Sequence, residues 1–262
     1  RRFRVCKRRM FLCNDFFRIL SRGVCSVYQA LYRKWRPKVF SDVIGQEHIT
    51  ETLKKQVAEG RTSHAYLFTG TRGTGKTTCA KILAKAVNCE HPVNGDPCCQ
   101  CPSCIGLESG SFLDVLELDA ASNNGVDQVR ALRDEAIYAP ANVKKRVYIV
   151  DEVHMLSTAA FNALLKILEE PPAHLMFILA TTELHKVPAT ILSRCQRYSF
   201  KRILPKDIAR RLTYVAQQEQ IDLTPDGAEL LSRLADGALR DGLSLLDQCA
   251  AAGGTVDSRA VL

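Results

Sequence analysis

The chain has 262 residues, of which 46% are hydrophobic and 24% are charged. This is ordinary globular usage, and it excludes an intrinsically disordered chain and a disulfide-stapled miniprotein. The longest apolar run, at 175–180, is far shorter than the roughly 18 residues that a membrane-spanning helix needs. We therefore expect a soluble protein with no membrane partner.

The net charge of +8 lies at one end of the chain. Residues 1–27 hold eight basic side chains and one acidic side chain, whereas the remainder holds 28 basic and 27 acidic ones. The body is nearly neutral, so a contact with nucleic acid would have to be local. We expect residues 1–27 to be a basic leader outside the fold. They are interpreted as translated upstream sequence before an authentic start at Val27, and an organellar presequence is the alternative.

The first predicted strand is the apolar run at 64–69, which ends at Gly70. It leads into Gly70-Thr71-Arg72-Gly73-Thr74-Gly75-Lys76-Thr77, a match to G-x4-G-K-[ST], with Thr78 next and a helical apolar repeat at 79–87. Such a loop wraps its backbone amides around a phosphate at the positive end of a helix. We predict a nucleotide site in which Lys76 contacts the β and γ oxygens and Thr77 ligates magnesium.

Four cysteines follow in the pattern C-x8-C-x2-C-x2-C, among proline, glycine and asparagine turn formers: Cys89, Cys98, Cys101 and Cys104. The two overlapping C-x2-C knuckles favour tetrahedral binding of one zinc ion over free thiols or disulfides. Cys99 is a spare thiol, and the register could shift to use it. Four sulfur ligands leave no open position for water, so the predicted site is structural.

Strands and helices then alternate. Strand candidates lie at 112–118, 146–150 and 175–181, and the segment 122–125 signals the start of an intervening helix. A stripe of leucines and phenylalanine at 161–168 predicts a helix packed on the core. This order predicts an α/β fold with a mostly parallel sheet covered on both faces.

The third strand ends in two carboxylates. Asp151 would hold the magnesium shell, and Glu152 would polarise the attacking water as general base. Acidic pairs at strand ends are common, and the phosphate loop is what makes this pair significant.

From Leu204 onward the sequence indicates helices alone. Pro205 and Pro225 stand at expected first helical turns, and Gly237 interrupts the pattern before a further leucine repeat. We expect a small helical domain of three segments at 204–262.

The order of these motifs resembles the gamma/tau family of the bacterial DNA polymerase III clamp loader. Five short motifs carry the resemblance beside the phosphate loop and the cysteines: Asp-Glu-Val-His at 151–154, Ala-Thr-Thr-Glu at 180–183, Ser-Arg-Cys at 193–195, Tyr-Arg-Lys-Trp-Arg-Pro at 32–37 and Val-Ile-Gly at 43–45. The resemblance covers residue 28 to the end. It implies an AAA+ domain at 28–203 with its zinc module at 89–104, a helical lid at 204–262 and a collar domain missing from this chain.

The resemblance also implies roles for single residues. Thr182 would sense the γ-phosphate, Arg194 would project into the ATP site of a neighbouring subunit, and Arg240 would contact nucleotide within its own chain. The adenine side would be formed by Arg36, Pro37, Val43 and Ile44. A surface salt bridge for Arg240 and a solvated arginine at 194 are the alternatives.

The function implied is that of a cytoplasmic ATPase motor subunit, which uses ATP, Mg²⁺ and Zn²⁺ and loads the sliding clamp onto primed DNA. Its partners would be delta, delta-prime and further gamma/tau copies in a hetero-pentamer, with the clamp and primed DNA. Segments 122–125 and 154–157 are the candidate DNA contacts, although ordinary N-caps explain both equally well.

Four other functions are kept beside it. They are a helicase or branch-migration ATPase, a zinc-containing nucleic-acid-binding protein, a eukaryotic or archaeal loader small subunit, and the delta-prime subunit. The cysteine insertion and Ser-Arg-Cys speak against the first, and the intact phosphate loop speaks against delta-prime.

Overall fold

The computed structural model describes residues 28–261, so the predicted basic leader lies outside the described residues. The elements from Leu31 onward belong to one compact unit. Within the described residues no helix is long and apolar enough to cross a membrane.

The centre of the unit is a parallel five-stranded sheet with the order β2-β3-β4-β1-β5. Its strands are β1 (Ala65–Thr69), β2 (Val115–Asp119), β3 (Arg146–Asp151), β4 (Leu175–Thr181) and β5 (Gln196–Ser199). The α/β class and the parallel sheet are confirmed. The edge strand β5 was missed, because its four residues are polar and mostly exposed, without the apolar run of a central strand.

The second strand begins later than the sequence indicates. It was expected at 112–118, but the backbone N–H groups of Ser111 and Phe112 both donate to the carbonyl of Gly106. These bonds belong to the turn that ends the preceding helix, α5 (Pro102–Ser109). Pairing with β3 therefore starts only at Val115.

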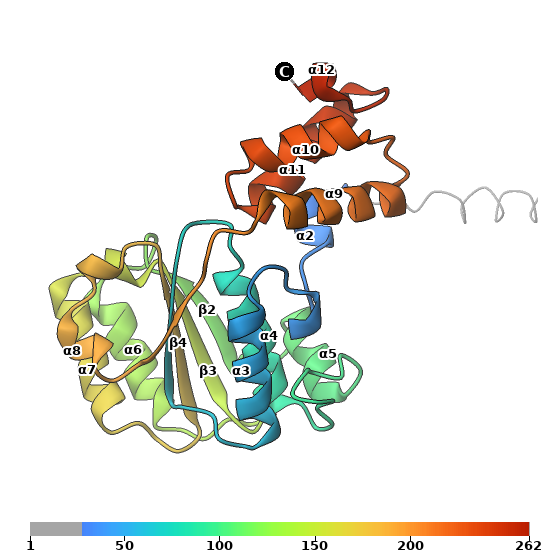
Figure 1. Cartoon of the computed structure of the whole chain (residues 1–262). Coiled ribbons are helices and arrows are strands. Elements are labelled where there is room, and N and C mark those ends of the chain that lie inside the picture. Colours follow the sequence, from blue (N-terminus) through green and yellow to red (C-terminus); the bar gives the residue numbers. More distant parts are fainter. Residues whose placement is uncertain (1–27, 262) are drawn as a thin grey trace, which may run out of the picture. The chain divides into compact units, whose positions relative to one another are not determined.

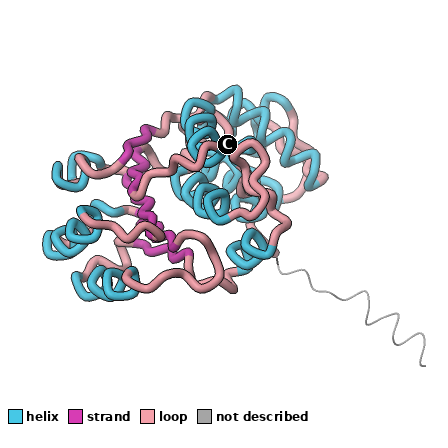
Figure 2. The backbone as a smooth tube through the Cα atoms, turned by 90° about the horizontal axis from the view of Figure 1, so that it is seen from below, coloured by secondary structure: helices cyan, strands magenta, loops and turns pink. Residues whose placement is uncertain are grey.

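Helices cover both faces of the sheet. The helices α3 (Glu47–Ala58) and α4 (Lys76–Asn88) pack on one face, and α6 (Val126–Ala136), α7 (Thr158–Glu169) and α8 (Ala189–Leu192) pack on the other (Figure 1). In the perpendicular view the strands run between helices on either side (Figure 2). Two separate apolar cores result, one on each side of the sheet.

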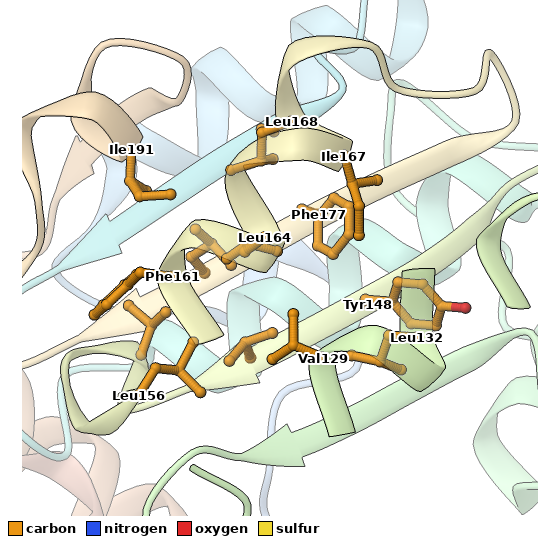
Figure 3. Close-up of a cluster of buried hydrophobic side chains, with 14 of the residues drawn as sticks. Val129, Leu132, Tyr148, Leu156, Phe161, Leu164, Ile167, Leu168, Phe177 and Ile191 are labelled. Carbon is orange, nitrogen blue, oxygen red and sulfur yellow. The ribbon is translucent and has the colours of Figure 1, made fainter. Parts of the chain in front are cut away.

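The predicted apolar stripe of α7 is core packing. Phe161, Leu164 and Leu168 of α7 lie against the sheet, where Tyr148 of β3 and Phe177 of β4 meet with ring centroids 5.5 Å apart (Figure 3). Burying one such leucine contributes about 1.5–3 kcal/mol. This packing fixes the carboxyl ends of β3 and β4, from which site residues extend.

A helical region follows the sheet. It contains α9 (Pro205–Glu219), α10 (Pro225–Leu234), α11 (Leu239–Ala252) and a short fourth helix, α12 (Ser258–Val261), where three segments were expected. Pro205 and Pro225 occupy first-turn positions, and Thr224 caps α10 by accepting from the N–H of Gly227. The short helix α2 (Leu31–Lys34) packs on this region, and the adjoining Trp35 indole donates to Glu219 across 2.8 Å.

Candidate functional site

A hollow of about 960 Å³ opens where β1, β2 and β3 end. Parallel strands deliver their carboxyl ends to one edge of a sheet, which is where ligands of such folds bind. The hollow brings together most of the predicted nucleotide residues: Arg36, Pro37, Val43, Ile44, Arg72, Gly73, Thr74, Gly75, Lys76, Thr77, Thr78, Asp151, Glu152 and Arg240. Gly70, Thr71, Thr182 and Arg194 are predicted site residues that do not line it.

Gly75 and Lys76 hold the conformation of the phosphate loop. Gly75 has a φ of 101° at the N-cap of α4, a conformation that other residues rarely adopt. The side chain of Lys76 is buried, and its Nζ donates to the carbonyls of Gly70 and Thr71, each at 2.9 Å. Gly70 and Thr71 therefore act through their backbone. Burial lowers the pKa of Lys76, while the nearby carboxylates of Glu152 and Asp151 oppose that shift.

Two oxygen groups suited to magnesium meet across the hollow. The Thr77 hydroxyl at the start of α4 donates to Asp151 Oδ2 at the end of β3 across 2.6 Å. Magnesium takes oxygen ligands at about 2.0–2.1 Å in an octahedron. A hydroxyl and a carboxylate this close can share one such ion, so the donor set fits the predicted cofactor.

Glu152 follows Asp151 in a left-handed conformation with a φ of 48°. Its Oε2 accepts from the backbone N–H of Thr182 at 3.2 Å and from the Thr182 hydroxyl at 2.9 Å. His154 Nδ1 lies 3.4 Å from the same oxygen, and His154 Nε2 lies 3.3 Å from Glu183. Thr182 thus reaches the site through Glu152 although it does not line the hollow.

The segment predicted to form the adenine side is hydrogen-bonded to the phosphate loop. Arg36 Nε donates to the Thr78 hydroxyl at 3.2 Å, and burial is the main cause that lowers the pKa of Arg36. The fully buried Gln46 exchanges two hydrogen bonds with the backbone of Lys201, at 2.7 and 3.1 Å. Its amide also donates to the carbonyl of Thr74 at 3.5 Å.

Sequence reasoning missed several groups of the site. Glu117 and Asp119 of β2 line the hollow and were not among the predicted site residues. Tyr32 and Trp35, which belong to the motif at 32–37 that carries the resemblance, also line it. The signal for Asp119 was present in the sequence, because β2 ends in this carboxylate just as β3 ends in Asp151. Nothing local identified Gln46, whose partners lie far along the chain.

The two arginines assigned by resemblance lie in different surroundings. The Arg240 guanidinium carbon is 4.9 Å from the centroid of the Tyr32 ring, within the hollow, a cation–π geometry. Arg194 lies outside the hollow just after α8, where its Nη2 contacts Glu169 Oε1 at 2.7 Å. Arg194 therefore does not line the hollow that holds the predicted nucleotide residues of this chain.

The two candidate DNA segments meet each other. The N–H of Ser157 donates to the carbonyl of Asn124 at 3.2 Å, and the Ser157 hydroxyl caps α7 by accepting from Ala160. The side chain of His154 is only 6% exposed. Within segment 154–157, therefore, the imidazole faces Glu152 and Glu183, away from any surface partner.

The predicted cysteine cluster assembles. The sulfurs of Cys89, Cys98, Cys101 and Cys104 all lie within 4.8 Å of one another. Sulfurs placed tetrahedrally at 2.3 Å from zinc would stand about 3.8 Å apart, and Cys98 and Cys104 are separated by 4.0 Å. Backbone N–H groups of Gln100 and then Cys101 point at the Cys98 sulfur and lower its pKa to about 6. The donor set fits zinc, and Cys99 is not among the four.

A family model described as DNA polymerase III, delta subunit, matches residues 45–203, more than half of the chain. A model of the ATPase lid domain of DNA polymerase III clamp-loader subunits matches residues 207–255. The chain belongs to the family of DNA polymerase III clamp-loader subunits. Within this clamp-loader family, it is 56% identical to DNA polymerase III subunit tau of Bacillus subtilis over 87% of its length. It is 50% identical to the tau subunit of Escherichia coli over 89% of its length.

The chain spans 41% and 36% of these two curated relatives. Among solved structures, the RuvB Holliday junction branch migration motor of Thermotoga maritima has a TM-score of 0.64 at 18% identity, covering 87% of this chain and 70% of that one. That likeness concerns the fold alone. The clamp-loader assignment, made from the order of motifs, is confirmed, and the helicase-type alternative retains only a shared architecture.

Proposed function

We propose that this chain is an ATP-hydrolysing motor subunit of the DNA polymerase III clamp loader, which loads the sliding clamp onto primed DNA during replication. The observation that carries the proposal is the Thr77–Asp151 contact of 2.6 Å beside Glu152 and a buried Lys76. An ATPase needs groups that bind the phosphates, groups that bind magnesium and a group that activates water. A member of the same family that only binds nucleotide lacks this complete set. The identity to tau subunits supports the same reading.

Each group has a role in this proposal. The backbone amides of 70–78 and Lys76 hold the phosphates, and Arg36, Pro37, Val43 and Ile44 form the adenine side. Thr77 and Asp151 would hold Mg²⁺, which supplies charge neutralisation on the phosphate oxygens. Glu152 is the general base for water, and Thr182 orients it toward the γ-phosphate.

Hydrolysis would need a neighbouring subunit. Arg194 is proposed to complete the pocket of the adjacent subunit, where such an arginine finger contributes about 10³ to 10⁵ in rate. Arg240 would contact nucleotide within its own chain. Partners are further gamma/tau copies, delta and delta-prime in a hetero-pentamer, with the sliding clamp and primed DNA. The proposed site of action is the cytoplasm.

Zinc is proposed as a structural ion on Cys89, Cys98, Cys101 and Cys104. Four thiolates leave no coordination position for substrate, so the ion would hold the loop between α4 and α5. Metal analysis of the purified chain should return one zinc per molecule. A chain purified without chelators that holds no metal would contradict the four-thiolate site.

The deciding experiment is an ATPase assay on a full-length version reconstituted with delta, delta-prime and clamp. Phosphate release is followed while primed DNA is titrated. A motor subunit turns over faster as primed DNA and clamp are added together, whereas a protein that only binds nucleic acid has no turnover to stimulate. The Lys76→Ala version provides the background rate.

A further inference from the structure

One short segment of backbone lies between the two halves of the adenine-side wall. Arg36 and Pro37 line the hollow before it, and Val43 and Ile44 line the hollow after it. The segment itself, 38–41, does not line the hollow. Its contacts therefore decide where both flanking parts of the wall stand.

Asp96 holds the far end of this segment. Its Oδ1 accepts from the backbone N–H of Phe40 at 2.6 Å, and its Oδ2 accepts from the Ser41 hydroxyl at 2.6 Å. Lys54 of α3 contacts the same carboxylate at 2.8 Å. With its side chain 13% exposed, Asp96 is largely shielded from water, so these three charge-assisted contacts act in a region of reduced dielectric.

Asp96 is a part of the four-cysteine module, which we define as residues 89–109. It pairs with Val93 through two backbone hydrogen bonds of 2.9 Å, and it lies two residues before Cys98. Gly95, which lies between Val93 and Asp96, has a φ of 84°, and a Cβ at this position would stand 2.1 Å from the carbonyl oxygen of Lys54. The module thus rests on α3 by direct backbone contact.

The near end of the segment is held by the other half of the module. The helix α5 begins directly after Cys101 and carries Glu108, which contacts Lys38 at 2.6 Å and Lys85 of α4 at 3.2 Å. The sulfur of Cys99 lies 3.8 Å from the carbonyl oxygen of Lys38. The module therefore contacts the segment at both ends, through Asp96 at one end and through Glu108 and Cys99 at the other.

We propose that the four-cysteine module sets the affinity of the nucleotide pocket, and that Asp96 is the positioning residue that links the module to the adenine-side wall. Metal on the four thiolates would fix the distance between the turn at 93–96 and α5, and through Asp96 and Glu108 the position of 38–41. The inference rests on the proposed nucleotide site, which it extends with a means of control.

The first test measures binding of a fluorescent, non-hydrolysable ATP analogue to the whole chain. Asp96→Ala removes three charge-assisted contacts and should weaken binding about tenfold or more, with metal content and far-UV circular dichroism unchanged. Asp96→Asn keeps an acceptor for the Phe40 N–H and should recover part of the loss. Glu90→Gln is the matched control, because Glu90 bonds Ser103 inside the module and should bind as wild type. Wild-type affinity in Asp96→Ala would overturn the proposal.

The second test asks whether the cysteine cluster acts through Asp96. Cys101→Ser should lose metal and weaken analogue binding. In the double variant with Asp96→Ala, the fold loss of affinity should be smaller than the product of the two single fold losses. Loss of metal with unchanged affinity, or fully independent effects, would overturn the coupling. Lys76→Ala in the same assay separates the two ideas: if wild type binds no better than Lys76→Ala, the nucleotide site itself is wrong.

Discussion

The Thr182 hydroxyl donates a hydrogen bond to the Glu152 carboxylate across 2.9 Å, and the Thr182 backbone N–H donates to the same oxygen across 3.2 Å. The two residues follow β4 and β3, which are neighbours in the sheet. The group proposed to activate water is thus held by the group proposed to sense the γ-phosphate. A phosphate that accepts a hydrogen bond from the Thr182 hydroxyl would compete with the Glu152 carboxylate for this donor and so change how the carboxylate is positioned.

Replacing Glu152 by Gln should preserve nucleotide binding and slow hydrolysis by about 10² to 10⁴, because the amide cannot accept the proton of water. Phosphate release from the reconstituted assembly measures turnover, and analogue titration measures affinity. Turnover at the wild-type rate would remove Glu152 as the base.

Replacing Thr182 by Val keeps the shape of the side chain and removes its hydroxyl. We expect turnover to fall about tenfold or more, as for loss of a hydrogen bond to a charged group, with affinity for the analogue nearly unchanged. Thr182→Ser keeps the hydroxyl and should stay within a few-fold of wild type. Equal losses in the Val and Ser versions would argue against a role for this hydroxyl.

Replacing Lys76 by Ala should abolish measurable nucleotide binding, because it removes a buried positive charge that the carbonyls of Gly70 and Thr71 hold inside the phosphate loop. Circular dichroism and thermal unfolding should remain near wild type. Unchanged affinity for ATP would contradict the phosphate assignment.

Replacing Arg194 by Ala should leave nucleotide binding by its own subunit intact and depress turnover only in the assembly, by up to about 10³ to 10⁵. Its contact with Glu169 joins side chains that are 33% and 50% exposed, so its loss should cost about 1 kcal/mol of stability or less. The exposed Arg197 is the matched control. Assembly turnover that is equal in both variants would exclude a finger at Arg194.

Thiol reactivity should follow burial. Burial raises the pKa of Cys79 to about 12 and of Cys195 to about 11, so at pH 8 both remain protonated and poor nucleophiles. The lowered pKa of Cys98, about 6, leaves it as a thiolate at that pH.

Alkylation at pH 8 followed by peptide mass spectrometry checks this order. Native protein should show slow labelling of Cys79 and Cys195, and chelator-treated protein should label Cys98 before either of these two. Protein unfolded in guanidinium serves as the control in which all thiols react. Rapid labelling of Cys79 in the native chain would contradict its burial.

Much of this protein could be read from local patterns. The glycine loop, the strand that ends in Asp151 and Glu152, and the spaced cysteines each depend on residues adjacent in the chain, where apolar periodicity and turn chemistry act directly. The same holds for Pro205 and Pro225, whose fixed φ suits a first helical turn. The edge strand β5 was not predicted from the sequence, because it is defined by its pairing with β1 and not by its composition.

Other relationships depend on which strands are neighbours, and no local pattern encodes that order. β4 lies between β1 and β3, so Thr182 meets Glu152 and Thr77 meets Asp151 across the sheet edge. Contacts over long chain separations brought Asp96 to Phe40 and left Arg194 outside its own pocket. The residue types in the sequence identified most of the site residues. The packing of the two apolar cores around one sheet determined which of these residues are in contact.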